Sequence, residues 1–542
     1  MALTPAVVVD GLTYHLADGT VVLDDVSATF PAGLTGLIGV NGSGKSTLLN
    51  LIAGRLTPTT GAVRVHGRVL LVPQRLTTAG SVAELLGIDG ILTALRAIEG
   101  GSVNPADYDA VGDMWDIEAR AVAELAALGL PAEVDFLDRP AATLSGGEAT
   151  RVALAGARLA RADVTLLDEP TNNLDTRTRR WLYDALDGWG GAVIVVSHDR
   201  DLLARVGALV DLDRHGAVSF GGGFDEYAAY KAERQATAER RLRDAEAELD
   251  RAKRQAQAEL QREAQRNRSA RKERAAGNVS KGAADFFQNR AEKGAGSKAV
   301  AHQRAVEEAV DARRQADDAA RRDDTIRLQL PDTTVPNSKD VLRVRVGEAT
   351  LAVVGPERIR LTGDNGTGKS TLLAFTLSGS PASDPAGILG DADLELAPTV
   401  PTGLLAQRLD ELDAFPTALD AVRDAAPGRT PHEARALLAR FLIRGDRADQ
   451  APATMSGGER FRVGLARTLF ADPPPQLLVL DEPTNNIDLA SAEQLVAALD
   501  DYRGALLIVT HDEHLARDLR VERIWTVTRQ GDTVEVADRA HA

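Results

Sequence analysis

The chain has 542 residues, of which 44% are apolar, so it is long enough for two to four domains with packed cores. It has no cysteine, which excludes disulfides and thiolate metal sites, and it shows neither a secretory signal nor an apolar run near the roughly 18 residues that span a bilayer, so we expect a cytoplasmic protein without membrane insertion. The net charge is −16, yet residues 231–325 carry 23 Lys/Arg against 18 Asp/Glu, so a basic centre lies between two acidic lobes.

The first motif along the chain is a phosphate-binding loop. A short apolar strand ends near residue 39, and GVNGSGKST follows it and leads into a helical run, as G-x-x-x-x-G-K-[ST] requires. Glycines let successive backbone N–H groups face phosphate oxygens, the lysine would reach the β- and γ-phosphates, and the serine would bind Mg²⁺. We expect the nucleotide to contact Gly39, Asn41, Gly42, Gly44, Lys45, Ser46 and Thr47.

Two further elements follow before the next buried strand. Gln74 stands in LVPQR, and LSGGEATR at 144–151 opens a predicted helix. Ser145 is the expected N-cap of that helix, so Ser145, Gly146 and Gly147 form a second candidate anion site.

Paired carboxylates then end an apolar strand in VTLLDEP. Burying Asp168 and Glu169 is costly unless a cation lies there, and the phosphate loop makes Mg²⁺ the expected cation. Asp168 would hold it together with Ser46 and Gln74, and Glu169 would polarise the attacking water. The alternative is that the carboxylates only cap the next helix. His198 lies in VVSHD, at the end of an apolar strand. It can contact the γ-phosphate there, although a lone His at such a place is more often structural.

The same parts then recur in the same order, which indicates an internal repeat. A second strand, Ile359–Gly363, precedes LTGDNGTGKSTLL, and LDEPTNNID matches the earlier LDEPTNNLD. The nucleotide-binding residues of the repeat are Gly363, Asn365, Gly366, Gly368, Lys369, Ser370, Thr371, Gln407, Ser456, Gly457 and Gly458. Asp481, Ser370 and Gln407 would hold Mg²⁺, Glu482 would act on water, and His511 would contact the γ-phosphate.

The stretch between the two repeats predicts an antiparallel helical hairpin with a basic tip. Residues 231–264 lack Pro and Gly, and such an arm would be about 50 Å long. Apolar residues form one heptad seam at Ala238, Leu242, Ala245, Leu249, Ala252 and Ala256, and a second at Ala305, Ala309, Ala312, Ala316 and Ala319.

The tip, at about 265–300, gathers basic residues. Within 262–304 there are 11 Lys/Arg and 4 Asp/Glu, which suits a phosphate backbone, although a charge run is more often a solvated face. Phe286 and Phe287 would either stack on bases or pack back onto the hairpin. The candidate RNA contacts are Arg266, Arg268, Arg271, Lys272, Arg274, Phe286 and Phe287.

The combined motifs resemble the ABC ATPase superfamily over roughly 5–225 and 340–535. The resemblance implies an α/β fold with two P-loop nucleotide-binding domains, ATP and Mg²⁺ as cofactors, ATP hydrolysis to ADP and phosphate, and head-to-tail sharing of each site. Each phosphate loop would then face the SGG turn of the other domain. Tyr14 resembles the adenine-stacking aromatic of the family, and the second half offers no aromatic at that place, which favours weaker base stacking there.

Two ABC domains, no membrane span and a basic helical linker resemble the ABC-F subfamily of ribosome-associated ATPases. Asn173 and Asn486 replace the His of that group's DEPTNHLD, and GGFDEYAAY at 222–230 also looks like the group. The resemblance implies a monomer that closes on ATP, with its linker tip directed at rRNA and P-site tRNA. The expected domains are 1–230, a linker at 231–325, and 326–542.

The stretch from Gln74 to the SGG turn is about 22 residues longer in the first half than in the second. This insertion, at about 86–120, is either a short form of the arm with which the subfamily touches the ribosome or an ordinary surface loop. A long linker, a modest arm and no C-terminal extension favour the antibiotic-resistance members, which displace drugs such as macrolides from the ribosome. The alternatives are a housekeeping translation factor and, from another class, the ATP-binding subunit of a drug exporter with a separate membrane partner.

Overall fold

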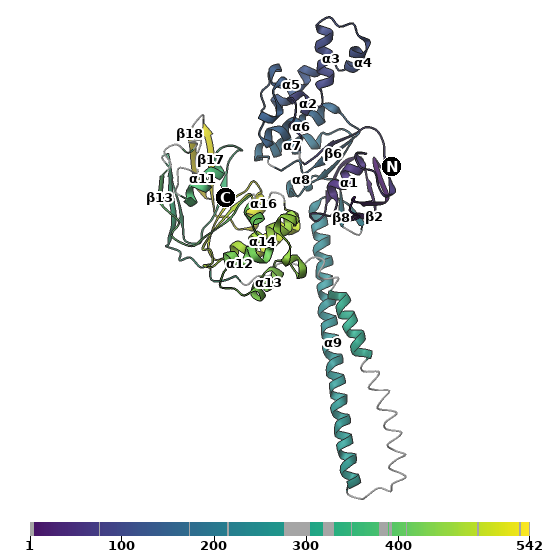
Figure 1. Cartoon of the computed structure of the whole chain (residues 1–542), viewed down its shortest axis with the longest axis vertical. Coiled ribbons are helices and arrows are strands. Elements are labelled where there is room, and N and C mark those ends of the chain that lie inside the picture. The colour runs from purple at the N-terminus through teal and green to yellow at the C-terminus, as the bar shows by residue number, and fades with distance from the viewer. Residues whose placement is uncertain are drawn as a thin grey trace. The chain divides into compact units, whose positions relative to one another are not determined.

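The structure is a computed structural model of the chain. It describes residues 5–74, 76–172, 174–213, 216–275, 304–317, 330–347, 349–378, 389, 393–407, 409–484, 487–530 and 533–540. The chain divides into two compact units, one made of residues 1–224 and 326–542 and the other of residues 225–325 (Figure 1). Within the described ranges, no helix has both the length and the apolar character that crossing a bilayer requires.

The larger unit contains two halves of similar build, which we call the first half (residues 5–224) and the second half (residues 330–540). The first half has a six-stranded sheet in the order β5-β6-β7-β3-β8-β9, parallel except for β9, and a three-stranded antiparallel sheet in the order β2-β1-β4. Its strands are β1 (Val7–His15), β2 (Val21–Phe30), β3 (Gly33–Ile38), β4 (Thr60–Val65), β5 (Val69–Val72), β6 (Val164–Asp168), β7 (Ala192–Val196), β8 (Ala208–Asp213) and β9 (Gly216–Gly221).

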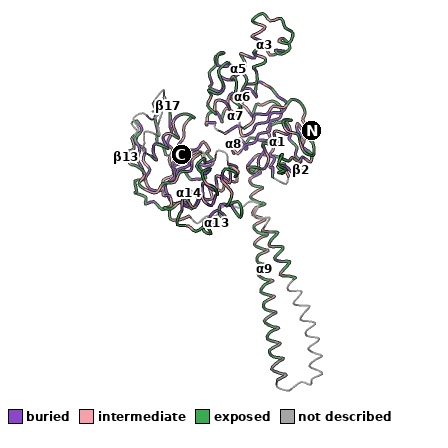
Figure 2. The backbone as a smooth tube through the Cα atoms, in the orientation of Figure 1, coloured by how far each residue is buried: buried purple, intermediate pink, exposed green. Residues whose placement is uncertain are grey.

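Among the described residues, the first half contains two separate apolar clusters, and its buried segments are drawn in purple in Figure 2. One lies between the six-stranded sheet, the three-stranded sheet and α1, and the other joins α2, α3, α5 and α6. Every residue of β6 and β7 is buried, as expected for parallel strands covered on both faces. The helices are α1 (Lys45–Ile52), α2 (Val82–Leu86), α3 (Asp89–Glu99), α4 (Pro105–Val111), α5 (Ile117–Ala127), α6 (Gly146–Ala160), α7 (Thr176–Asp187) and α8 (Arg200–Leu203).

The second half repeats this architecture. Its six-stranded sheet has the order β14-β15-β16-β12-β17-β18, and its three-stranded sheet has the order β11-β10-β13. The strands are β10 (Asp340–Val346), β11 (Ala349–Val354), β12 (Arg358–Thr362), β13 (Asp393–Leu396), β14 (Thr402–Leu405), β15 (Leu477–Asp481), β16 (Ala505–Val509), β17 (Arg523–Gln530) and β18 (Thr533–Ala540). The helices are α11 (Lys369–Ser378), α12 (Ala418–Ala425), α13 (Pro431–Arg440), α14 (Gly457–Leu469), α15 (Leu489–Leu499) and α16 (Glu513–Asp518). The predicted fold class is therefore confirmed.

The smaller unit contains α9 (Phe224–Ala275), a single helix of 52 residues. It is longer than the expected arm at 231–264 and ends two residues before Gly277, so the basic residues from Arg262 to Arg274 stand on helix. The predicted seam of α9 is confirmed, because Leu249 is buried and the other five seam residues are half-buried, while most of their neighbours are exposed.

The returning helical segment at 304–317 lies beside α9, and Arg313 pairs with Glu246 at 3.6 Å (Figure 1). Its predicted seam is only partly right. Ala309 is buried and Ala316 half-buried, but Ala305 and Ala312 are exposed, and Val306 and Arg313 are half-buried in their place. An alanine methyl group buries little area, so the longer side chains of Val306 and Arg313 occupy the half-buried positions in place of Ala305 and Ala312. Ala319 lies outside the described residues.

Candidate functional site

The predicted site residues follow neighbouring parallel strands. Gln74 follows β5, Asp168 ends β6, His198 follows β7, and Gly39 follows β3. Because the carboxyl ends of parallel strands meet at one edge of a sheet, this strand order brings the four residues to a common edge. In the second half the same edge carries Gln407, Asp481, His511 and Gly363, after β14, β15, β16 and β12.

Both phosphate loops adopt a backbone that requires glycine. Gly39 has φ +145°, and a Cβ there would lie 2.2 Å from the carbonyl oxygen of Leu212. Gly363 has φ +151°, and a Cβ there would lie 2.2 Å from the carbonyl oxygen of Val527. Any side chain would push the loop off its strand, so the compact turn depends on these two glycines. Left-handed backbone also occurs at Gly42, Gly44, Gly366 and Gly368.

The loop lysines are buried and lie inside their own loops. Lys45 Nζ donates to the carbonyl oxygens of Gly39, at 2.6 Å, and Val40, at 3.1 Å. Lys369 Nζ makes the matching bonds to Gly363, at 2.8 Å, and Asp364, at 3.0 Å. Burial lowers the pKa of both ammonium groups, and nearby carboxylates oppose that shift. Each loop therefore holds a cation where a phosphate would be bound.

A glutamate and a histidine face each other at the end of each central strand pair. Glu169 and Glu482 have φ of +51° and +45°. The distance from His198 Nε2 to Glu169 Oε1 is 3.1 Å, and that from His511 Nε2 to Glu482 Oε1 is 3.5 Å. Burial raises the pKa of Glu169 to about 8 and of Glu482 to about 7, and burial lowers the pKa of each histidine to about 3. Both imidazoles are therefore neutral at pH 7.

The aspartates fit a divalent cation. Burial raises the pKa of Asp168 and of Asp481, and a hydrogen bond from Ser46 or Ser370 respectively opposes that shift. Asp481 Oδ1 is buried without a hydrogen-bond partner among the described residues, as an oxygen awaiting a cation would be. One carboxylate with a hydroxyl suits Mg²⁺, which takes its remaining ligands from phosphates and water.

Each SGG turn opens a helix, so the predicted serine N-caps are confirmed. Ser145 Oγ accepts the amide N–H of Glu148, and Ser456 Oγ accepts that of Glu459. Both glutamates bond back to the amide of the serine, which completes a capping box. Gly146, Gly147, Gly457 and Gly458 stand at these helix starts, where free N–H groups suit an anion.

Contacts across the two halves involve Asp488 and Thr176, two residues that the sequence did not single out. The amide of Asn41, in the first phosphate loop, donates to Asp488 Oδ2 of the second half at 2.7 Å. Thr176 Oγ1 of the first half lies 3.3 Å from His511 Nδ1. Asp488 and its counterpart Asp175 also cap α15 and α7. The signal was present, because both copies of the repeated LDEP motif end in Asp.

The remaining predicted residues are placed as follows. Tyr14, on β1, is half-buried against the apolar cluster beside α1. Gln74 and Gln407 are exposed. Arg268 is exposed on α9, and Arg266, Arg271, Lys272 and Arg274 belong to the same helix. Phe286, Phe287, Asn173 and Asn486 lie outside the described residues.

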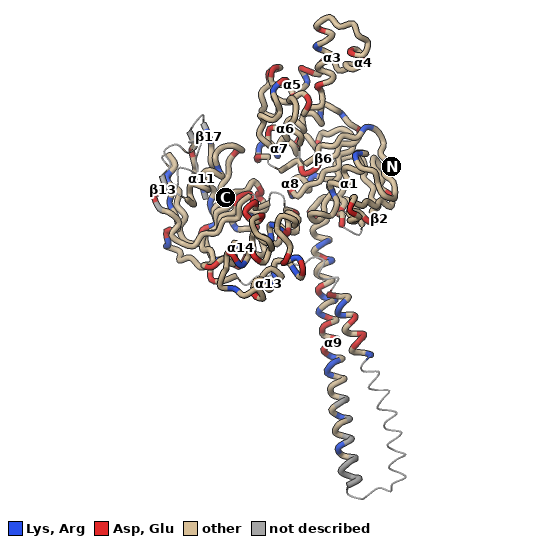
Figure 3. The backbone as a smooth tube through the Cα atoms, viewed as in Figure 1, with Lys and Arg blue, Asp and Glu red and all other residues tan. Residues whose placement is uncertain are grey.

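Charge changes sign along α9 (Figure 3). Residues 225–250 carry five Lys/Arg and eight Asp/Glu, whereas residues 251–275 carry nine Lys/Arg and three Asp/Glu. The second part of α9, residues 251–275, is therefore basic, whereas the first part is acidic.

A protein-family model described as "ABC transporter" matches residues 23–172 and 347–485. The tylosin resistance ATP-binding protein TlrC of Streptomyces fradiae is 34% identical over 539 residues, which cover 92% of this chain and 93% of TlrC. The energy-dependent translational throttle protein EttA of Mycobacterium tuberculosis is 29% identical over 532 residues, which cover 91% of this chain and 86% of EttA. The archaeal ribosome recycling factor aABCE1, solved with the stalk protein aP1, shares the fold at 17% identity, with a TM-score of 0.56 over 97% of this chain and 89% of that one.

The family model matches both halves, and the two relatives align with more than nine-tenths of the chain. These matches agree with the paired phosphate loops, acidic strand ends and capped SGG turns. The chain is an ATPase that belongs to the ABC family and, within it, to the ABC-F subfamily.

Proposed function

We propose that this ATPase binds the ribosome when ATP has closed its two halves, and that it protects translation from a macrolide-type antibiotic. The protein would act in the cytoplasm as a monomer, with rRNA and P-site tRNA as partners of the linker tip. The observation that carries the proposal is the joining of two complete ATPase halves by a long helical hairpin whose charge turns basic along its length.

The proposed chemistry at each site uses groups that the fold brings to one edge. The backbone N–H groups of the loop and the buried lysine would bind the β- and γ-phosphates. Mg²⁺, held by Asp168 and Ser46 or by Asp481 and Ser370, with Gln74 or Gln407 beside it, would neutralise charge on the phosphates. Glu169 and Glu482 would position the attacking water, and His198 and His511 would contact the γ-phosphate.

The opposite half would supply the contact that closes the two halves around ATP. An SGG turn brings a helix N-terminus, which favours the negative γ-phosphate of ATP over the product ADP. ATP would therefore hold the halves together, and hydrolysis would release them. Tyr14 would stack on the adenine of the first site.

The name of TlrC supports the resistance role, because that relative covers nearly the whole chain. The name of EttA supports the alternative, a translation factor without a drug. An exporter subunit would leave the basic part of the linker unexplained, so we do not favour that alternative.

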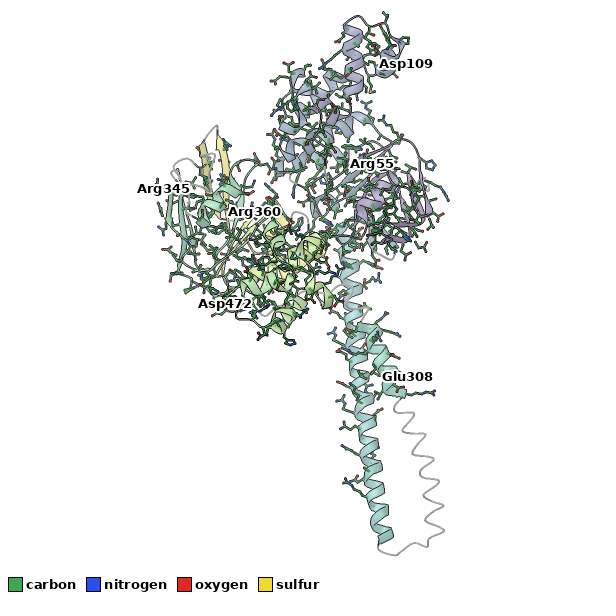
Figure 4. All side chains as sticks on the ribbon, in the orientation of Figure 1. Arg55, Asp109, Glu308, Arg345, Arg360 and Asp472 are labelled. Atoms are coloured by element: carbon green, nitrogen blue, oxygen red, sulfur yellow. The ribbon has the colours of Figure 1, made fainter. Side chains whose placement is uncertain are left out.

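The insertion at about 86–120 supplies a second candidate contact with the ribosome. Val103, Tyr108 and Trp115 are 86%, 43% and 49% exposed, and the two rings lie 6.1 Å apart. Residues 97–119 contain six acidic residues and no basic one, and Asp109 marks this region in Figure 4. Phosphates repel such a surface, so we propose that it meets a basic protein of the ribosome rather than RNA.

Replacing both glutamates, Glu169→Gln with Glu482→Gln, should lower ATP turnover by about 100-fold or more while ATP still binds. Turnover by phosphate release and affinity with a fluorescent ATP analogue measure the two effects. Parental turnover in the double variant would reject the role given to the glutamates.

The same double variant tests whether the protein binds the ribosome. With ATP it should pellet with 70S ribosomes through sucrose, and with ADP it should stay in the supernatant. Expression of the parent in a sensitive host should raise the minimal inhibitory concentration of tylosin but not of a drug that acts on the cell wall. ATP-dependent pelleting without any protection would favour the translation-factor alternative.

Reversing three charges near the tip, Arg268, Arg271 and Lys272→Glu, should weaken ribosome binding and reduce the salt slope of log K by about two to three. The matched control reverses the exposed Arg240, Arg241 and Arg243 in the acidic part of α9. Equal effects of the two triple variants would favour the alternative, that the basic tip is only a solvated surface.

Replacing Tyr108 and Trp115 by Ala should weaken ribosome binding several-fold, since truncating an aromatic anchor at an interface typically costs about 1–2 kcal/mol. ATP turnover of the free protein should stay at the parental value, because neither ring belongs to an ATP site. Unchanged ribosome affinity would make the insertion an ordinary surface element.

A further inference from the structure

A buried arginine of the second half takes no part in the site described above. Arg360, only 2% exposed, lies on β12 between β16 and β17 (Figure 4). Its Nε donates to the carbonyl oxygen of Thr510 at 2.9 Å, and its Nη1 lies 2.8 Å from Glu513 Oε2. Thr510 immediately precedes His511, and Glu513 follows it by two residues. The arginine therefore contacts the chain both before and after His511.

Burying a guanidinium is costly unless its hydrogen bonds and charge are matched. Arg360 finds both matches on this one loop, a backbone carbonyl and a carboxylate. Losing the arginine would leave a buried carbonyl unpaired and free the loop to move. Its contacts thus indicate a tether for the loop.

The first half has a different residue at the position that corresponds to Arg360. Gly36 stands three residues before Gly39, just as Arg360 stands three residues before Gly363. A Cβ at Gly36 would lie 2.7 Å from Leu209 Cδ2 and 2.9 Å from Leu203 Cδ2, so these two leucines leave no room for a side chain at this place in the first half. Leu203 lies five residues after His198, and the residue five after His511 is the smaller Ala516.

The charge partner differs as well. Arg200 stands two residues after His198, where the second half has Glu513. Arg200 pairs instead with Asp518 of the second half, at 3.1 Å. Three positions thus differ together between the halves: glycine, leucine and arginine in one, and arginine, alanine and glutamate in the other.

The two imidazole rings also differ in their partners. His511 Nδ1 lies 3.3 Å from Thr176 Oγ1, whereas His198 Nδ1 has no hydrogen-bond partner among the residues that the structure describes. The residue that matches Thr176 is Leu489, which lines a cavity together with His198 and cannot form such a bond. The second histidine is therefore held at its backbone and at its ring.

We propose that Arg360 is a positioning residue for His511, so that ATP turnover at the second phosphate loop depends on it while turnover at the first does not. This inference rests on the proposed contact between His511 and the γ-phosphate. Arg360 touches no reacting atom and acts through the loop of Thr510 to Glu513.

The test measures ATP turnover of the full chain with one site silenced. In Glu169→Gln, where the second site works alone, Arg360→Gln should lower kcat about tenfold or more and change KM less than about twofold. In Glu482→Gln, where the first site works alone, the same change should leave kcat within about twofold. Arg360→Lys, which keeps a cationic donor, should recover part of the loss. An equal fall in both backgrounds, or no fall in Glu169→Gln, would overturn the proposal.

Two further variants separate positioning from damage to the fold. Arg360→Gly with Ala516→Leu installs the glycine and leucine of the first half, keeps the space filled, and should show the same selective loss. Arg358→Gln is the matched control, because Arg358 lies on the same strand and donates to the carbonyls of Leu499, Tyr502 and Leu519 instead. It should lower the melting temperature without favouring either site.

A second measurement does not depend on hydrolysis. In protein with ¹³C-labelled histidine, Arg360→Gln should shift or broaden the ring signal of His511, assigned with His511→Gln, and leave that of His198 in place. An unmoved His511 signal would overturn the tether. A moved signal with unchanged turnover in Glu169→Gln would reject the proposed role of His511 in hydrolysis, so the two failures are distinguishable.

Discussion

Carboxylates at the buried ends of apolar strands constrain the rest of this structure. Asp168 and Glu169, like Asp481 and Glu482, stand where water is largely excluded, and burial raises the pKa of all four. Such groups are tolerated only beside positive charge, which the buried loop lysines supply at each site. The glycines that fold each loop around its lysine follow from the same requirement.

The two halves are bound together through these same elements. Asp488 caps a helix of its own half and also accepts the amide of Asn41 in the opposite phosphate loop. Burial would raise the pKa of Asp488, but these amide bonds outweigh it and hold the pKa below its usual value. A change in the shape of one loop is therefore felt directly by the other half. The halves are nevertheless unequal, as Thr176 against Leu489 and Arg360 against Gly36 show.

Sequence motifs predicted the α/β class, the order of the site residues and the serine N-caps, because a phosphate loop and a capping box are local patterns with one physical solution. Contacts between distant residues were beyond their reach. Arg360 bonds a carbonyl 150 residues away, and nothing in RIRLTGDNG marks that partner. The predicted seam at 305–319 was only partly right for a related reason. Alanines bury so little area that the longer side chains of Val306 and Arg313 take half-buried positions beside Ala309 and Ala316. Asp488 was not among the predicted site residues although the repeat ends on it, because no local pattern marks its contact with Asn41 of the other half.

The length of α9 has a mechanical consequence. A continuous helix of 52 residues is about 78 Å long. With no proline or glycine between Phe224 and Ala275, it has no built-in joint at which a bend would be absorbed. A tilt of its first turn by about 10° would then swing its far end through about 13 Å, so the helix can act as a lever that turns an ångström-scale motion into a displacement the size of a nucleotide.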